Sequence, residues 1–169
     1  MTAETILYDS SDSPLGRLWI ALSPRGVCRI AFDMAEAEFV AGLRADYGVE
    51  PRRDPERAAE ARRQIGEYLS GKRVAFELPL DLDGVSDFQR RALTACAGIP
   101  YGQTRSYAEL ARELGQAGAA RAVGGAMAHN PLPLIIPCHR VLRSDGGLGG
   151  FGGGLDIKRR LLDLERAHQ

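Results

Sequence analysis

The 169-residue sequence predicts an α/β (α+β) protein in two parts: a small antiparallel sheet with helices, then a mostly helical half. Apolar runs alternate with turn signals near the start, whereas capped helical patterns dominate the second half. The charge also changes sign: residues 1–83 hold 11 Lys and Arg against 15 Asp and Glu, and residues 84–169 hold 11 against 7. We therefore expect two domains, 1–83 and 84–169, whose opposite charges cancel to a formal net charge of zero.

The first half opens with three strand-like runs, at Ile6–Tyr8, Leu18–Leu22 and Val27–Phe32. The turn signals Ser13–Gly16 and Ser23–Gly26 separate these runs. Short turns between neighbouring strands predict an antiparallel meander.

Two helices and a linker complete the first half. Apolar residues recur at helical spacing through 39–47, which predicts the first helix. The pair Asp54-Pro55 supplies an N-cap and a proline at the first helical position of the second helix, which ends at Gly71. Residues 72–84 resemble a short strand followed by a linker.

The second half is mostly helical. Ser86–Gln89 and Ser106–Glu109 both fit the capping-box pattern, and they predict helices at about 87–97 and 107–114. A further helix at about 118–129 follows a short turn. The helices at 107–114 and 118–129 therefore resemble a helix-turn-helix.

The C-terminal part carries an irregular segment and one more helix. The prolines of Pro131–Pro137 exclude a regular helix and predict that Pro137–Arg140 is extended. A glycine-rich stretch, 149–154, then leads into a last helix at about 156–167.

The dipeptide Cys138-His139 is the clearest candidate for chemistry. A thiol reacts as its thiolate, so a nucleophilic Cys138 needs a base, and an extended backbone would let His139 reach it only through a water or a bend. Glu165 lies at the edge of the apolar face of the last helix, where a buried carboxylate would need a partner such as a histidine ring. The alternatives are a structural cysteine beside an incidental histidine and a solvated glutamate at a helix end.

The predicted helix 118–129 has an unusually bare surface formed by Gly124, Gly125 and Ala128, with Arg121 as its one long cation. Glycine inside a helix costs about 1 kcal/mol relative to alanine, so a close approach by another surface is indicated. A nucleic-acid backbone and a tightly packed neighbouring helix both satisfy this requirement.

Several classes of protein are not expected. The three cysteines are few, and an odd number cannot all pair, so they do not indicate a disulfide framework and favour a reducing compartment. The sequence has neither a CxxC pair nor zinc-finger histidine spacing, and it has no signal peptide pattern or apolar run of membrane-spanning length. We therefore expect a cytoplasmic protein without a metal.

Several segments together resemble one family. Ile135–Val141 (IIPCHRV) is similar to the active-site signature of the O6-alkylguanine-DNA alkyltransferases. The segments 88–89, 99–104, 106–107, 120–124, 130–131 and 153–155 follow in the family's order. The resemblance is close over roughly 76–169, and it implies an RNase H-like N-terminal domain for the first half.

The resemblance implies a direct DNA repair protein that flips O6-methylguanine, and O4-methylthymine, out of duplex DNA and transfers the alkyl group irreversibly to its own cysteine. On this pattern Cys138 is the acceptor, His139 deprotonates it through a water, and Glu165 orients His139. Tyr107 donates a proton or hydrogen bond to the leaving guanine. Asn130 ties the turn that holds the active-site segment.

The same resemblance implies the contacts with DNA. The helix with Gly124, Gly125 and Ala128 would lie in the minor groove, Arg121 would fill the stack behind the flipped base, and Tyr107 would contact that base. The walls of the base pocket would include Val141, Gly152 and Pro133. No cofactor or membrane is implied, and we expect a monomer, with cooperative assembly on DNA left open.

Two other functions compete with methyl transfer. Alkyltransferase-like proteins recognise alkylated DNA without repairing it, but they lack the acceptor cysteine that this sequence has in Cys138. A cysteine hydrolase using Cys138, His139 and Glu165 would turn over repeatedly, but the sequence shows no obvious oxyanion hole. The sequence therefore predicts a single-turnover methyltransferase.

Overall fold

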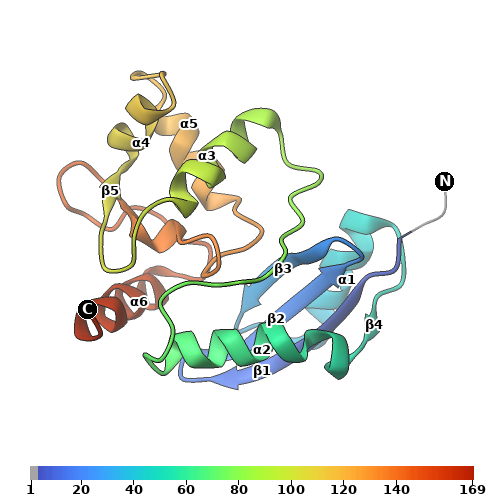
Figure 1. Cartoon of the computed structure of the whole chain (residues 1–169). Coiled ribbons are helices and arrows are strands. Elements are labelled where there is room, and N and C mark those ends of the chain that lie inside the picture. The colour runs from blue at the N-terminus through green and yellow to red at the C-terminus, as the bar shows by residue number, and fades with distance from the viewer. Residues whose placement is uncertain (1–3) are drawn as a thin grey trace. The chain divides into compact units, whose positions relative to one another are not determined.

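The computed structural model describes residues 4–169 (Figure 1). The chain divides into two compact units, one ending at Asp81 and the other spanning Leu82–Gln169. No helix among the described residues is both long and apolar enough to cross a membrane.

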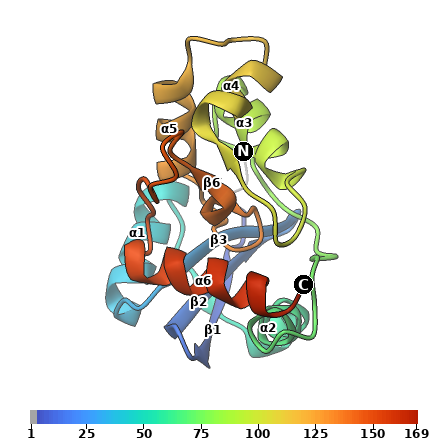
Figure 2. The ribbon, with the colours of Figure 1, turned by 90° about the vertical axis from the view of Figure 1, so that its left-hand side faces the viewer.

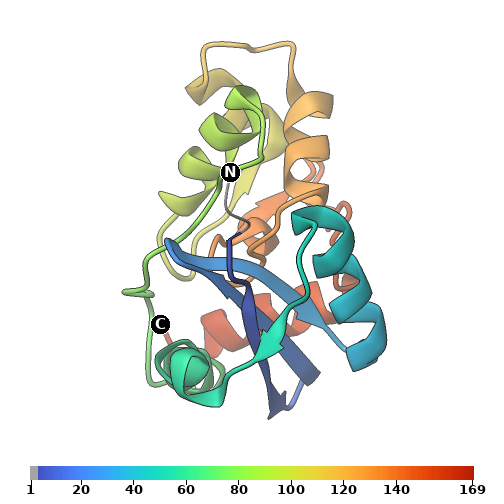
Figure 3. The same cartoon turned by 90° about the vertical axis from the view of Figure 1, so that its right-hand side faces the viewer.

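The first unit is built on a four-stranded sheet of order β3-β2-β1-β4 (Figure 3). β1 (Leu7–Ser13), β2 (Gly16–Ser23) and β3 (Gly26–Phe32) pair antiparallel, which confirms the predicted meander. β4 (Arg52–Arg53) pairs parallel with β1 and makes the sheet mixed. A two-residue strand is too short for a periodic pattern, so β4 was not predicted.

The segment 72–84 is not a regular strand. It contributes an isolated parallel bridge in which Leu80 lies opposite Val27. The amide of Val27 donates to the Pro79 carbonyl at 2.9 Å, and the amide of Asp81 donates to the Val27 carbonyl at 2.9 Å. A Cβ atom on Gly26 would stand 2.3 Å from the Pro79 oxygen, so only glycine permits this close approach.

Two helices pack with this sheet, α1 (Glu36–Tyr47) and α2 (Pro55–Leu69). Phe39 and Leu43 of α1 are buried against a core that includes Tyr8 and Trp19. The Trp19 and Phe39 rings stack with centroids 5.6 Å apart. At the start of α2 the Asp54 side chain accepts from a backbone amide, as the sequence predicted.

The second unit contains four α-helices, namely α3 (Asp87–Ala97), α4 (Tyr107–Glu113), α5 (Ala120–Ala128) and α6 (Leu155–Ala167). The Ser86 and Ser106 side chains cap α3 and α4 by accepting from the Gln89 and Glu109 amides at 3.1 and 3.0 Å. The helix α4 packs on α5, in agreement with the predicted helix pair. Figure 2 shows α3, α4 and α5 grouped together, with α6 on the other side of the segment that carries β6.

The segment after Pro137 differs from its prediction. Instead of being extended, Cys138–Arg140 forms a 3-10 turn, η1, in which the Arg140 amide donates to the Pro137 carbonyl at 2.9 Å. The chain then continues as β6 (Val141–Leu142), which pairs parallel with β5 (Arg105–Ser106). The turn buries three consecutive side chains, which a strand with alternating faces would not do.

Candidate active site

Cys138 opens the turn η1 and is only 4% exposed. Burial raises the pKa of its thiol, because a thiolate is poorly solvated there. A hydrogen bond from the Asn130 side chain and the charge of Lys158 lower the same pKa. The site thus needs a base to generate the thiolate near neutral pH.

Asn130 holds the segment that leads to this cysteine. Its side-chain nitrogen donates to the Ile136 carbonyl at 3.0 Å, and its oxygen accepts from the Leu132 amide at 2.9 Å. These two hydrogen bonds close the proline-containing loop onto itself, two residues before Cys138.

His139 and Glu165 form a buried pair between η1 and α6. The ring Nε2 of His139 lies 2.6 Å from Oε2 of Glu165, and the two side chains are 0% and 1% exposed. Because a carboxylate only accepts hydrogen bonds, Nε2 carries the proton, and a neutral ring then has its lone pair on Nδ1. The structure therefore favours the buried Glu165 over the solvated alternative, and the pairing fixes the tautomer that a base requires.

Arg140 is the third member of this cluster. Its Nε and Nη2 atoms each donate to a Glu165 oxygen at 2.9 Å, and its Nη1 donates to the Ile99 carbonyl at 2.6 Å. The amide of Gly102 adds a further hydrogen bond to Glu165 at 3.0 Å.

The guanidinium of Arg140 compensates the charge of Glu165, so the neighbouring imidazole can remain neutral. Burial lowers the pKa of His139, and this effect outweighs the opposing influence of Glu165. Arg140 belongs to the IIPCHRV signature, but the sequence assigns it no role, because it does not show that this arginine is buried beside Glu165.

Lys158 is a second buried cation that sequence reasoning missed. Its ammonium donates to the carbonyls of Val141 at 2.7 Å and Gly150 at 3.2 Å, and also to that of Leu148. It lies 5.8 Å from the centroid of the Tyr107 ring. Burial lowers the pKa of Lys158 to about 8. This one side chain thereby ties the glycine-rich loop to β6.

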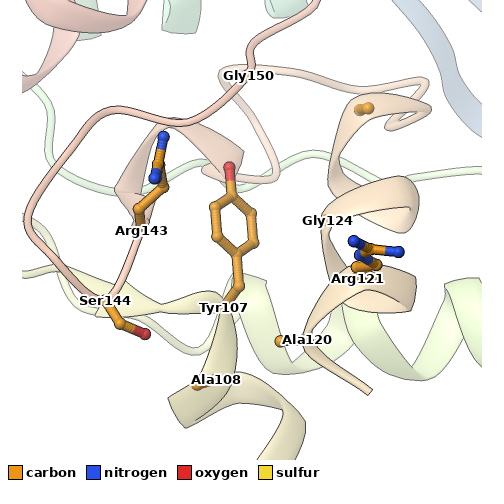
Figure 4. Close-up of a pocket in the computed structure, with 9 residues that line it drawn as sticks. Tyr107, Ala108, Ala120, Arg121, Gly124, Arg143, Ser144 and Gly150 are labelled. Carbon is orange, nitrogen blue, oxygen red and sulfur yellow. The ribbon is translucent and has the colours of Figure 1, made fainter. Parts of the chain in front are cut away.

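A pocket of about 440 Å³ opens between α4, α5 and the loop after β6 (Figure 4). It is lined by Tyr107, Ala108, Ala120, Arg121, Gly124, Ala128, Arg143, Ser144 and Gly150. Four of these residues, Tyr107, Arg121, Gly124 and Ala128, were predicted to contact DNA. Arg143 and Ser144 were not expected at this site, whereas Gly150 belongs to the glycine-rich stretch that was expected to form a wall of the base pocket.

Cys138, His139, Asn130 and Glu165 do not line this pocket, and neither do four residues predicted to contact DNA or the flipped base. Gly125 is exposed on α5, and a Cβ atom there would meet nothing within 4 Å. Val141 is fully buried, and its carbonyl accepts a hydrogen bond from the Lys158 ammonium. Pro133 is also buried, and it forms an isolated β-bridge with Ile136. Gly152 is exposed, and a Cβ atom there would lie 3.9 Å from the Ala128 carbonyl oxygen.

The glycine-rich loop lies directly against Tyr107. A Cβ atom on Gly149 would stand 2.6 Å from the Tyr107 hydroxyl, and the φ angle of Gly149 is +69°. Only glycine meets both requirements. Burial raises the pKa of Tyr107, so the phenol stays protonated and can donate a hydrogen bond into the pocket.

Within residues 4–169, no three His, Cys, Asp or Glu side chains are grouped so that they could hold a metal ion. Cys28 and Cys96 are free and buried, and burial raises the pKa of both thiols. Their positions in β3 and α3 are typical of structural cysteines.

The fold and the site together define a protein with a mixed-sheet unit and a helical unit, in which a buried cysteine opens the turn that carries a buried histidine and arginine paired with a glutamate. Residues 87–167 match the family model described as the DNA binding domain of 6-O-methylguanine DNA methyltransferase. Residues 6–82 match that described as the ribonuclease-like domain of the same protein. The chain belongs to the 6-O-methylguanine DNA methyltransferase family.

Named relatives are similar in sequence to this protein over nearly the whole chain. A methylated-DNA–protein-cysteine methyltransferase of Mycolicibacterium paratuberculosis is 44% identical, covering 96% of this chain and 94% of the relative. The constitutive enzyme of that name in Bacillus subtilis is 38% identical, covering 94% of each chain. The crystal structure of Mycobacterium tuberculosis OGT in complex with DNA superposes with a TM-score of 0.84 at 39% identity, covering 96% of this chain and 94% of that one.

Proposed function

We propose that this protein repairs DNA directly by moving the alkyl group of O6-methylguanine to the Sγ atom of Cys138. The observation that carries the proposal is the buried pair of His139 and Glu165, 2.6 Å apart, in which His139 lies on the same turn as the cysteine. The family and its named relatives supply the substrate class.

The first step is removal of the thiol proton. With Nε2 donating to Glu165, the Nδ1 side of His139 takes the proton from Cys138 through a water molecule. A thiolate suits displacement at a methyl carbon because sulfur is soft and strongly nucleophilic.

In the second step a bond forms between Sγ and the methyl carbon while the bond from that carbon to O6 of guanine breaks. The electron pair of the broken bond stays on the guanine, and Tyr107 donates a hydrogen bond or proton as negative charge develops there. The product, S-methylcysteine, is a thioether that water does not hydrolyse, so each molecule acts once. The same chemistry applies to O4-methylthymine.

We propose the following contacts with duplex DNA. The bare surface of α5, with Gly124, Gly125 and Ala128, enters the minor groove, and Arg121 fills the space left by the flipped base. The exposed positions of Gly125 and Ala128 and the place of Arg121 at the pocket support this arrangement. Val141, Pro133 and Gly152 form walls of the base site.

We also propose that the protein works in the cytoplasm, as a monomer that can bind neighbouring positions on DNA. The functional boundary lies at 83/84, and the second domain carries the DNA contacts. The excess of basic over acidic residues in 84–169 supports this assignment, because phosphate contacts supply most non-specific affinity.

The test is the intact mass after incubation with duplex DNA that contains O6-methylguanine. We expect one added CH2 per molecule, on the peptide that contains Cys138, and no second addition with excess DNA. Cys138→Ala should bind the same duplex without any mass change. Absence of transfer by folded protein, or repeated turnover on a thioester substrate, would overturn the proposal.

A further inference from the structure

The pocket has a second arginine on the side that faces Arg121. Arg143 and Ser144 line the pocket from the loop after β6, whereas Arg121 lines it from α5. Figure 4 shows the Tyr107 ring between the two arginine side chains. Two cations thus lie on either side of the aromatic ring at which the flipped base is proposed to sit.

The loop presents Arg143 from an ordered turn. The Arg143 amide donates to the Gly147 carbonyl at 2.9 Å, and the Gly146 amide donates to the Arg143 carbonyl at 2.9 Å. The Asp145 side chain accepts from the Gly147 amide at 2.8 Å. Parallel pairing of β6 with β5 anchors the start of this turn. The backbone at Arg143 is therefore already ordered in the free protein, so binding would order mainly the side chain.

The partner of Arg143 in the free protein is weakly held. Its Nη2 lies 3.2 Å from Asp145, and both side chains are 64% exposed. Exposed pairs of this kind contribute about 0–1 kcal/mol, because solvent screens the charges. A phosphate accepts two parallel hydrogen bonds from a guanidinium and binds it more strongly than such a carboxylate does.

We propose that Arg143 is a phosphate-binding cation of the DNA interface, which exchanges Asp145 for a phosphate across the pocket from Arg121. This inference rests on the proposed function, since it requires DNA at this pocket. Arg143 binds a phosphate of the DNA strand, whereas Arg121 fills the space that the flipped base leaves in the base stack. Asp145 competes with the phosphate, so it weakens binding to undamaged DNA.

The experiment measures binding to an undamaged duplex by fluorescence anisotropy over a series of salt concentrations. Each phosphate neutralised contributes about 0.9 to the slope of log K against log salt. Arg143→Gln should reduce the slope by about 0.9 and weaken binding about three- to tenfold at low salt. Arg143→Lys should retain the parent slope, because it keeps the charge.

Two further variants complete the design. Asp145→Asn keeps an oxygen for the Gly147 amide but removes the competing charge, so it should bind more tightly than the parent. Arg166→Gln is the matched control, because Arg166 and its partner Asp163 are 66% and 62% exposed on α6, outside the pocket. It should leave the slope unchanged.

Two additional measurements separate the possible failures. A urea unfolding midpoint of Arg143→Gln equal to that of the parent would show that the variant is folded. A slope for Arg143→Gln equal to that of Arg166→Gln would overturn the role of Arg143. If the parent still transfers a methyl group from methylated duplex in that case, only this inference fails. A parent that neither binds nor repairs DNA would overturn the proposed function as well.

Discussion

Replacing Glu165 by glutamine tests the cluster that orients the base. Glu165 accepts hydrogen bonds from His139, from Arg140 and from the Gly102 amide. Glutamine has nearly the same shape but only one accepting oxygen, and its amide nitrogen would face a donor. The variant also leaves Arg140, which is 7% exposed, without its buried counter-charge.

The expected cost follows from this geometry. Removing one partner of a buried ion pair costs about 3–5 kcal/mol, because the other charge stays desolvated. With a urea m-value of about 2 kcal/mol/M, the unfolding midpoint should fall by about 1.5–2.5 M. The transfer rate should fall by about 10²- to 10⁴-fold, which is the contribution of a positioned general base.

Urea titration followed by far-UV circular dichroism measures the first effect, and quenched single-turnover transfer to Cys138 measures the second. Asp163→Asn is the control, because it removes an exposed carboxylate 3.4 Å from Arg166 on the same helix and should cost less than about 1 kcal/mol. If Glu165→Gln behaved like this control in both assays, the buried cluster would be neither a stability determinant nor the support of the base.

Three further substitutions give distinct results. Because burial lowers the pKa of His139 below 6.5, the unfolded chain takes up this proton first, and the free energy of unfolding should fall as pH drops below about 6.5. The decrease measured by urea titration should be smaller in His139→Gln, and equal pH profiles would contradict the neutral ring. Gly149→Ala should slow repair and cost about 1–3 kcal/mol of unfolding free energy, because its Cβ would collide with Tyr107 at a positive φ. Its control Gly66→Ala, where nothing lies within 4 Å of the new atom, should be neutral or stabilising by up to about 1 kcal/mol in the same titration. Lys158→Met should speed amide hydrogen exchange in the glycine-rich loop, since three carbonyls lose their donor; unchanged exchange would show that Lys158 does not order the loop.

The parts of the fold that local chemistry determines could be predicted from the sequence. Ser86, Ser106 and Asp54 cap helices as their patterns indicate, because a cap involves residues only three positions apart. The antiparallel meander could also be predicted from the sequence, since its turns are short. The strand β4 could not be predicted, because its pairing joins Leu7 to Arg52 and depends on the path of α1.

The site shows the same division. Cys138 and His139 stood out as neighbours in the sequence, and the position of Glu165 near an apolar helix face suggested a buried partner. The hydrogen bonds of the Arg140 guanidinium could not be predicted from the sequence, because they reach 25 residues along the chain to Glu165 and 41 residues to the Ile99 carbonyl. The 3-10 turn was also missed, since it depends on the packing of three consecutive buried side chains.

The helix α6 carries two of the buried charged groups that organise the site, Lys158 and Glu165. They lie seven residues apart, which is two helical turns, so one face of α6 presents both. This helix follows every other element of the site along the chain. During synthesis the cysteine segment is therefore made before these two groups. The carboxylate that orients His139 reaches it only when α6 packs on η1, so the base is complete only in the folded second unit.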